Sequence, residues 1–260
     1  MERAKSIGFP LITLAAILAA WQVSVTWLQV PDYLLPTPRA VWNALYQAYV
    51  EGTFWPHFFF TLQATSIGYL AGCSAGLLMG ALLAESRTFE QFVYPYIVAL
   101  QSMPKVALAP LIIVWLGFDL ASKVVMVALV CFFPVFVNTV VGIRQTSPAL
   151  LDLMKVFSGS RARTFFRVKL PAAASHIFAG LQVAIVLSLI GAVVAEFVAS
   201  SKGLGYLIKA ASVSFETNVM FAALLSLALI GVVASHLVRL LHHAVVFWDR
   251  NASSGSVIAE

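Results

Sequence analysis

Six long apolar stretches dominate the pattern of hydrophobic and polar positions along the chain. Each could cross the hydrocarbon core of a bilayer, which takes roughly 20 apolar residues in an α-helix. The first follows Arg3 and Lys5 but is longer than the roughly 7–15 apolar residues of a signal peptide, so we expect it to be retained. The pattern predicts an all-α, polytopic transmembrane bundle of about six spans, near residues 7–28, 58–84, 92–117, 121–143, 176–199 and 218–241.

Composition strengthens this interpretation. Of the 260 residues, 61% are hydrophobic and 10% are charged, whereas a soluble domain carries about 25% charged residues. Cys73 and Cys131 lie inside apolar runs, which is typical of small buried side chains rather than of a disulfide framework or a metal site. No basic stretch is interleaved with aromatic residues, so nucleic-acid binding is not expected.

The distribution of lysine and arginine predicts the orientation, because cytoplasmic loops are enriched in both residues. With six alternating spans and a cytoplasmic N-terminus, 11 of the 16 basic residues fall on the cytoplasmic side and 4 on the outer side, while Lys105 lies within a span. Both termini are therefore predicted to be cytoplasmic. The outer four are Arg39, Lys123, Lys202 and Lys209.

The connections predict three parts of the chain. Residues 1–57 form the first span and an outer segment, in which 39–51 has apolar residues at helical spacing and is predicted to be an amphipathic helix at the membrane interface. Residues 58–243 form the main transmembrane domain, with an outer loop at 200–217. Residues 244–260 form a cytoplasmic tail.

A stripe of glycines marks the second span. Gly68, Gly72, Gly76 and Gly80 are four residues apart and therefore share one helix face. Such a face lets another backbone approach closely, which is how helices pack in lipid. The sequence leaves open whether the partner helix belongs to the same subunit or to a second one.

The third span contains two prolines that should break its helix, Pro104 and Pro110. Broken helices are tolerated at membrane depth where they line a cavity or pack against protein. Lys105 lies between the breaks and next to Met103, so both are candidates for a translocation path; the alternative for Lys105 is a lysine that extends to the interface. Glu196, near the outer end of the fifth span, is a candidate for the same path or a structural acid at its mouth.

The segment 144–175 is the most basic part of the chain. Six basic residues against Asp152 give it a net charge of +5, as large as that of the whole chain. Proximity to anionic lipid alone could explain this charge. However, Pro148 begins a helical pattern whose apolar ridge is predicted to be Leu150, Leu151, Met154 and Phe157 and which Gly159 is expected to stop. A second short helix is predicted from Arg161 to Leu170-Pro171. An apolar helix with basic flanks suits a groove on a partner protein.

This segment also resembles a known family. The run Ser158-Gly-Ser-Arg-Ala-Arg-Thr-Phe-Phe-Arg-Val-Lys-Leu-Pro171, followed by Gly180-Leu181, is similar to the cytoplasmic loop of ABC-importer permeases, the inner membrane components of binding-protein-dependent transport. Pro104-Lys-Val-Ala-Leu-Ala-Pro-Leu-Ile-Ile-Val-Trp-Leu-Gly-Phe118, Ala195-Glu-Phe197 and Gly203-Leu-Gly-Tyr206 resemble the nitrate, sulfonate and taurine branch. The likeness covers about residues 58–243.

The resemblance implies that the loop is a coupling helix on which a separate ATPase docks. It assigns this role to Met154, Phe157, Gly159, Ser160, Arg161, Thr164 and Phe165. The sequence departs from the family's Glu-Ala-Ala pattern, because Leu153, Met154 and Lys155 occupy those positions. Larger side chains there alter how closely an ATPase can approach.

The function implied is that of a permease subunit in an ATP-driven importer for a small solute, such as a nitrate-, sulfonate- or taurine-like anion or a small heterocycle. Implied partners are cytosolic ATPase subunits, an extracytoplasmic solute-binding protein and a second permease copy in the cytoplasmic membrane. The chain has no Walker A pattern, so it is not expected to be an enzyme or to bind a cofactor, with ATP and Mg²⁺ held by the partner. The alternative is a secondary transporter driven by an ion gradient, which would show paired broken helices.

Overall fold

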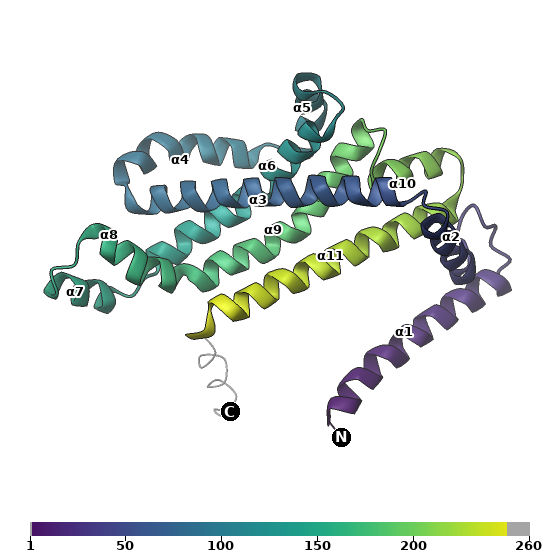
Figure 1. Cartoon of the computed structure of the whole chain (residues 1–260), viewed down its shortest axis with the longest axis horizontal. Helices are drawn as coiled ribbons and strands as arrows, with labels where there is room; N and C mark the ends of the chain where they lie inside the picture. Colours follow the sequence, from purple (N-terminus) through teal and green to yellow (C-terminus); the bar gives the residue numbers. More distant parts are fainter. Residues whose placement is uncertain (1, 249–260) are drawn as a thin grey trace. The chain divides into compact units, whose positions relative to one another are not determined.

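The computed structural model describes residues 2–248, with side chains from Ile12 onward. Residues 249–260 of the predicted tail and the side chains of Arg3 and Lys5 lie outside the described part. All regular elements between residues 2 and 248 are helices (Figure 1). They are α1 (Glu2–Trp27), α2 (Pro38–Val50), α3 (Trp55–Glu85), α4 (Arg87–Ser102), the 3₁₀ turn η1 (Lys105–Leu108), α5 (Ala109–Leu116), α6 (Leu120–Arg144), α7 (Pro148–Val156), α8 (Arg161–Thr164), the π turn η2 (Phe165–Lys169), α9 (Leu170–Val198), α10 (Leu204–Val213) and α11 (Thr217–Val245).

Four described helical segments are long and apolar enough to cross a bilayer: α3, α6, the continuous run Arg161–Val198, and α11. A fifth candidate is the broken pair α4 and η1–α5. The all-helical membrane fold is thus confirmed. The first predicted span coincides with α1, but its described apolar part, Ile12–Trp27, falls short of 18 residues, so the count of six spans stays a prediction.

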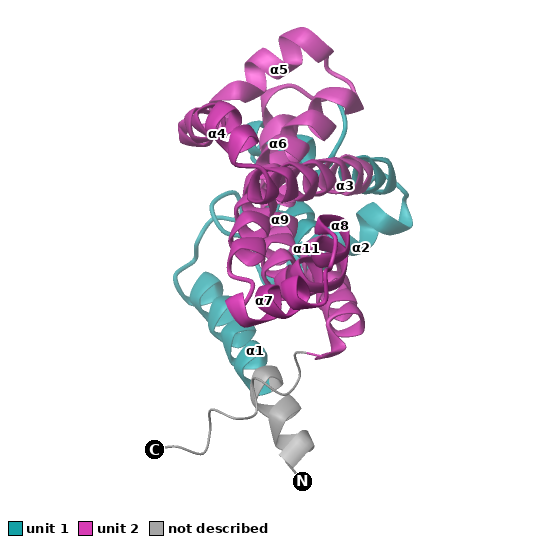
Figure 2. Ribbon diagram, turned by 90° about the vertical axis from the view of Figure 1, so that its left-hand side faces the viewer, with its two compact units in different colours: residues 1–61, 201–228 teal, residues 62–200, 229–260 magenta. Residues whose placement is uncertain are grey.

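The chain divides into two compact units (Figure 2). Unit 1 comprises residues up to 61 together with 201–228, and unit 2 comprises residues 62–200 together with the chain from 229 onward.

The glycine stripe of α3 lies against α6 of the same chain. A Cβ built on Gly76 would lie 2.6 Å from the Phe132 carbonyl oxygen, and one on Gly80 would lie 2.9 Å from that of Phe136. Gly72 meets Ala128 in the same way. Residue numbers rise together along both helices, so α3 and α6 run parallel with their backbones in direct contact.

Helix α9 packs on α6 in the opposite direction. A Cβ on Gly180 would lie 2.9 Å from the Pro134 carbonyl oxygen, and Gly191 lies beside Val127. At the other end of this contact, a Cβ on Gly142 of α6 would lie 2.8 Å from the Cβ of His176. Numbers rise on one helix as they fall on the other, so the two helices are antiparallel, as expected for spans that follow each other through a bilayer.

The third predicted span is broken, as its prolines predict. Helix α4 ends at Ser102, and α5 ends at Leu116 after a bend of 90°. Pro104 caps the intervening η1 turn and Pro110 lies in the first turn of α5, where a missing N–H costs little. The fourth span, by contrast, continues through Pro134 without ending.

Two sequence-based expectations are wrong. The second short helix of the basic segment does not stop at Leu170-Pro171, because the chain forms one helical run of 38 residues from Arg161 to Val198. The π turn η2 accommodates Pro171: the Leu170 N–H donates to the carbonyl of Phe165, five residues earlier, which widens the helix where the proline ring would crowd a normal turn. The segment 200–217, predicted to be a loop, contains α10.

Helix α10 is capped within unit 1 by side chains of α3. Its N-cap Gly203 has φ of 112°, a value that favours glycine, and provides no capping side chain. Instead, the Gly203 N–H donates to His57 Nδ1 (3.1 Å) and the Leu204 N–H donates to Thr61 Oγ1 (2.8 Å). Distant capping residues explain why sequence alone gave no helix signal here.

The helix predicted at 39–51 is confirmed as α2, and its place on the outer side of the membrane stays a prediction. Thr37 accepts a hydrogen bond from the Ala40 N–H and so caps the helix. Val41 is buried, whereas Trp42 is 64% exposed.

Lys123, assigned to the outer side from its sequence position, is fully buried near the start of α6. Its Nζ donates to the carbonyl oxygens of Phe118 (2.5 Å) and Ala199 (2.6 Å) and to Ser122 Oγ (3.3 Å). Ala199 is the C-cap residue of α9, so the ammonium joins the turn before α6 to the end of α9. The carboxylates of Glu196 and Asp119 act on it electrostatically.

The α3–α6 contact predicts that Gly72→Leu destabilises the protein by about 1–3 kcal/mol, since the side chain has no space against Ala128. Thermal unfolding in detergent can be followed with a thiol dye that reacts with Cys73 and Cys131, both buried in the folded state. Ala75→Leu adds a leucine on an exposed position of the same helix and is the control. Equal melting temperatures for the two variants would contradict the close contact.

Lys123→Met should destabilise the protein by on the order of 3 kcal/mol, because the Phe118 and Ala199 carbonyls and the buried Glu196 carboxylate lose their cation. The same dye assay measures this effect. Lys155→Met, at an 79% exposed side chain, should change stability by less than about 0.5 kcal/mol. Equal melting temperatures for the two variants would show that Lys123 does not join the turn before α6 to the end of α9.

Candidate functional site

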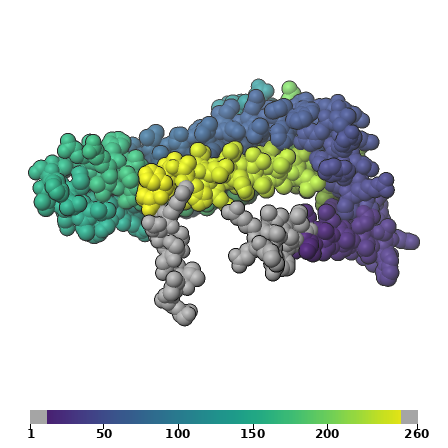
Figure 3. Space-filling view, turned by 60° about the horizontal axis from the view of Figure 1, so that its bottom comes forward, coloured from purple at the N-terminus to yellow at the C-terminus, as the bar shows by residue number. Residues whose placement is uncertain are grey.

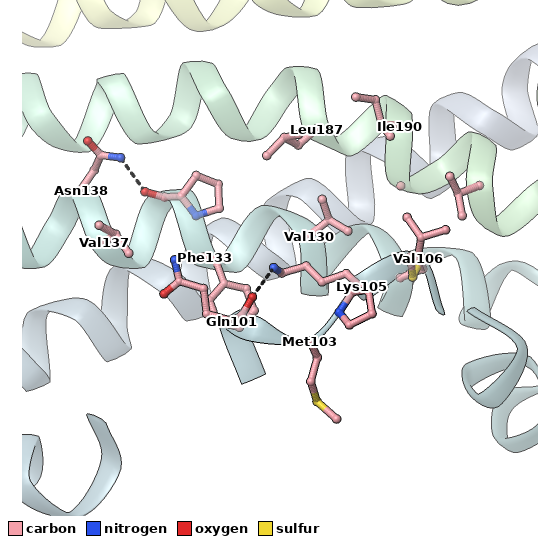
Figure 4. A pocket seen from close by; sticks show the side chains of 15 residues that line it. Gln101, Met103, Lys105, Val106, Val130, Phe133, Val137, Asn138, Leu187 and Ile190 are labelled. Carbon is pink, nitrogen blue, oxygen red and sulfur yellow. Dashed lines mark hydrogen bonds between the residues drawn. The ribbon is translucent and has the colours of Figure 1, made fainter. Parts of the chain in front are cut away.

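A cavity of about 580 Å³ lies in unit 2 between the broken third span and helices α6 and α9. Three of its lining residues are polar, Gln101, Lys105 and Asn138, and the others are apolar or glycine (Figure 4). This size is within the range of ligand pockets, roughly 300–1,000 Å³. The break between α4 and η1 forms one wall, which fits the rule that irregular backbone at membrane depth lines cavities.

Lys105 is the ionisable residue of this lining. Its Nζ donates to the carbonyl oxygen of Gln101 (3.3 Å) and lies 4.5 Å from the centre of the Phe133 ring, a cation–π contact (Figure 4). Gln101 lies in the last turn of α4, where carbonyls lack helical partners. Among the side chains that the structure describes, from Ile12 to Trp248, no carboxylate lies within 4.0 Å of this ammonium.

The other path candidates take different places. Met103 also lines the cavity and is 47% exposed, with a side chain that extends away from the Lys105 ammonium (Figure 4). Glu196 is not among the lining residues: it is fully buried on α9, near Lys123. The structure therefore brings Lys105 and Met103 together and leaves Glu196 apart from them.

A second hollow, of about 550 Å³, continues from the first along α4 and α6. Gln101 and Val137 line both. It ends at the ion pair between Arg144 and Glu90, whose Nη2 and Oε2 atoms are 2.7 Å apart. The two hollows thus follow α6 from Lys105 toward the end of the helix that leads into the basic segment.

The basic segment forms a separate lobe of unit 2 that follows the end of α6 (Figures 1 and 3). Helix α7 exposes Leu150 (44%), Leu153 (51%) and Phe157 (71%) along one face, while Leu151 and Met154 are half-buried. The expected ridge therefore exists with Leu153 in place of Leu151 and Met154. Apolar side chains exposed together beside charged ones are typical of an interaction surface.

The turn between α7 and α8 differs from the expected glycine stop. Ser158, with φ of 52°, adopts the left-handed conformation, and its N–H donates to the Lys155 carbonyl (3.0 Å). The Gly159 N–H donates to the Met154 carbonyl (2.8 Å). This pair of bonds is a Schellman motif whose left-handed residue is Ser158. Space at Gly159 is limited instead: a Cβ would lie 2.6 Å from Cε at the flexible end of Met154 and 3.0 Å from the Met154 carbonyl oxygen.

The remaining predicted docking residues surround this turn. Ser160 caps α8 by accepting from the Arg163 N–H (3.3 Å), and Thr164 Oγ1 donates to the Ser160 carbonyl (3.1 Å). Phe165 packs against the core cluster that contains Ile143. Arg161 is exposed.

Charge pairing reduces the basic segment to three free arginines. Arg144 pairs with Glu90, Lys169 with Glu85 at 2.5 Å, and Lys155 with Asp152 at 2.8 Å. Among the residues the structure describes, Arg161, Arg163 and Arg167 have no carboxylate within 4.0 Å. Their guanidinium groups thus remain available beside the apolar face of α7.

Sequence reasoning missed two residues of these sites. Phe133 lies in an apolar run with nothing to mark it until the structure places it against Lys105. For Lys123, the sequence does contain a signal of a buried partner. The residue lies inside an apolar stretch, shortly after the turn at Gly117, and a charge in such surroundings is costly unless it is paired.

Comparisons with known proteins agree with this arrangement. Residues 72–247 match the family described as the binding-protein-dependent transport system inner membrane component. The chain is 40% identical to a probable ABC transporter permease of Haemophilus influenzae over 222 residues, which cover 85% of the chain and 90% of the relative.

Two further relatives have named solutes. A riboflavin transport permease of Chloroflexus aurantiacus is 38% identical over 94% of the chain and 91% of its own length. A putative aliphatic sulfonates transport permease of Bacillus subtilis is 34% identical over 93% of the chain and 87% of its own length. The chain therefore belongs to the family of inner membrane components of binding-protein-dependent transport systems, as a multi-pass ABC importer permease of the cytoplasmic membrane.

Proposed function

We propose that the chain spans the membrane six times with both termini in the cytoplasm and, together with a second permease copy, forms the path of an importer driven by a separate ATPase. Residues 148–165 are the coupling element on which the ATPase docks. The observation that carries the proposal is the exposed face of Leu150, Leu153 and Phe157 beside three unpaired arginines. An acidic and partly apolar groove on a cytosolic partner complements both features.

Coupling follows from how this element is joined to the spans. Three residues separate the end of α6 at Arg144 from residues 148–159, and Arg161 begins the 38-residue run that contains α9. A displacement of α7 and α8 by the ATPase is transmitted to both helices, because α6 and α9 are held together along their length. Rigid-body motion of packed elements between two arrangements is a common form of switching.

The translocation path in this proposal runs along α4 and α6, from the Lys105 cavity to the Arg144–Glu90 pair. Lys105 and Met103 line it. Glu196 acts at its outer end, where it and Lys123 fix the end of α9. The domain limits proposed are residues 58–243 for the permease domain, with 1–57 before it and the tail 244–260 after it.

The solute proposed is a small molecule of the kind that relatives' names give, such as an aliphatic sulfonate or a small heterocycle. An extracytoplasmic binding protein delivers it, and ATP and Mg²⁺ bind to the ATPase partner rather than to this chain.

The docking face predicts the effect of Leu153→Ser combined with Phe157→Ser. Loss of two apolar contacts of this kind costs roughly 1–3 kcal/mol of binding, about ten- to a hundredfold in Kd. The measurement is titration of the purified permease, in nanodiscs, with its ATPase partner. Lys155→Ser, on the opposite face of α7, is the control and should bind as the wild type does. Unchanged affinity in the double variant would refute docking at this face.

The tight turn predicts that Gly159→Leu uncouples transport from ATP hydrolysis, because the added side chain crowds the Met154 carbonyl oxygen at the end of α7 and shifts this helix. Stimulation of ATP hydrolysis by solute-loaded binding protein in proteoliposomes should be lost. Ser158→Gly is the matched control: it removes a strained left-handed serine, should raise stability by about 1 kcal/mol, and should leave coupling intact. Full coupling in Gly159→Leu would contradict the role of this turn.

A further inference from the structure

We propose that Lys105 and Phe133 form a binding station inside the permease for the anionic group of an organic solute. This inference rests on the proposed function, since it takes the cavity along α4 and α6 as the path, and it narrows the solute to a small anion with an apolar body. The permease itself, and not its binding protein alone, then selects the charge of what passes.

The ammonium of Lys105 is placed to receive an anion. It donates one hydrogen bond to the Gln101 carbonyl at 3.3 Å, and one side rests over the Phe133 ring. Lysine has three N–H donors, so donors remain for a ligand. The absence of a carboxylate within 4.0 Å in the described part of the chain leaves the positive charge uncompensated, and a buried or half-buried cation favours an anionic partner.

The rest of the lining defines the other part of the solute. Apart from Gln101, Lys105 and Asn138, the cavity wall is made of apolar side chains and one glycine, including Val130, Val137 and Leu187 (Figure 4). A small inorganic anion would exchange most of its hydration shell for this apolar wall, with only Lys105, Gln101 and Asn138 to replace the lost water. An organic anion instead places its charged group at Lys105 and its carbon skeleton against the apolar wall.

Neutral and cationic solutes fit less well. A cation is repelled by the ammonium, and a neutral solute leaves the charge without a partner in surroundings of low polarity. A purely structural role is the competing explanation, in which Lys105 serves only to satisfy the Gln101 carbonyl at the end of α4. Such a role requires a hydrogen-bond donor and makes no use of the charge in the cavity.

Charge selectivity of the cavity separates these explanations. In a chain with Cys73 and Cys131 replaced by Ala, Val137→Cys places one thiol in the cavity wall, one helical turn from Phe133. Its reaction rates are measured with two methanethiosulfonates of similar size: the sulfonatoethyl reagent, an organic anion, and the trimethylammonioethyl reagent, a cation. The ratio of the two rates reports the potential at this site.

With Lys105 present, the ratio of anionic to cationic rates should exceed the ratio measured for a small free thiol, and Lys105→Met should lower it by about tenfold. Lys105→Arg keeps the charge and should keep the ratio, and a melting temperature for each variant verifies that it is folded. An unchanged ratio in Lys105→Met would overturn the proposal, as would an equal loss in Lys105→Arg, because charge would then not set the selectivity. This assay uses the full-length permease without an ATPase and so does not depend on docking. Failure of the proposed docking would appear only in the titration with the ATPase, which distinguishes the two outcomes.

Discussion

Backbone contact around α6 is the constraint on which the arrangement of unit 2 depends. Lipid is as apolar as the side chains themselves, so helices in a bilayer associate through close packing and not through the hydrophobic effect. Glycines provide that packing here. Helix α3 runs parallel to α6 and brings four glycines against it, and helix α9 runs antiparallel to α6 and brings Gly180 and Gly191 against it. With these sides occupied, the broken third span meets α6 on the side where the cavity lies.

The break in the third span gives this cavity its chemistry. Proline at 104 ends α4 early, which leaves the last carbonyls of α4 without helical partners and places Lys105 within reach of one of them. Phe133, held against the neighbouring core by Phe132 and Phe136, provides the ring beneath the ammonium. A second lysine, Lys123 near the start of α6, has a structural role: it is fully buried and donates to two carbonyl oxygens and to Ser122 Oγ. Lys123 therefore uses its N–H donors to hold the fold together, whereas Lys105 retains free donors.

In the proposed coupling element, α8 and the π turn η2 are continuous with α9. The π turn around Pro171 keeps the helix continuous where a proline would otherwise have ended it, and Lys169 fastens this turn to Glu85 at the end of α3. Between α7 and α8, Ser158 adopts the left-handed conformation and Gly159 lies close to the Met154 carbonyl oxygen. This continuity supports the proposal that a displacement of α8 by an ATPase reaches α9.

The sequence by itself determined the all-helical membrane fold, the break at Pro104, the glycine face of α3 and the basic segment, because each depends on local composition, on proline geometry or on a fixed spacing along one helix. Its motifs were also sufficient to indicate the family. Only the tertiary structure decided that the glycines face α6, that Phe133 lies beside Lys105, that α10 is a helix capped by His57 and Thr61, and that Ser158 rather than Gly159 takes the left-handed conformation. These features depend on residues distant in the chain or on the hydrogen bonds of a particular turn, and a one-dimensional pattern carries neither.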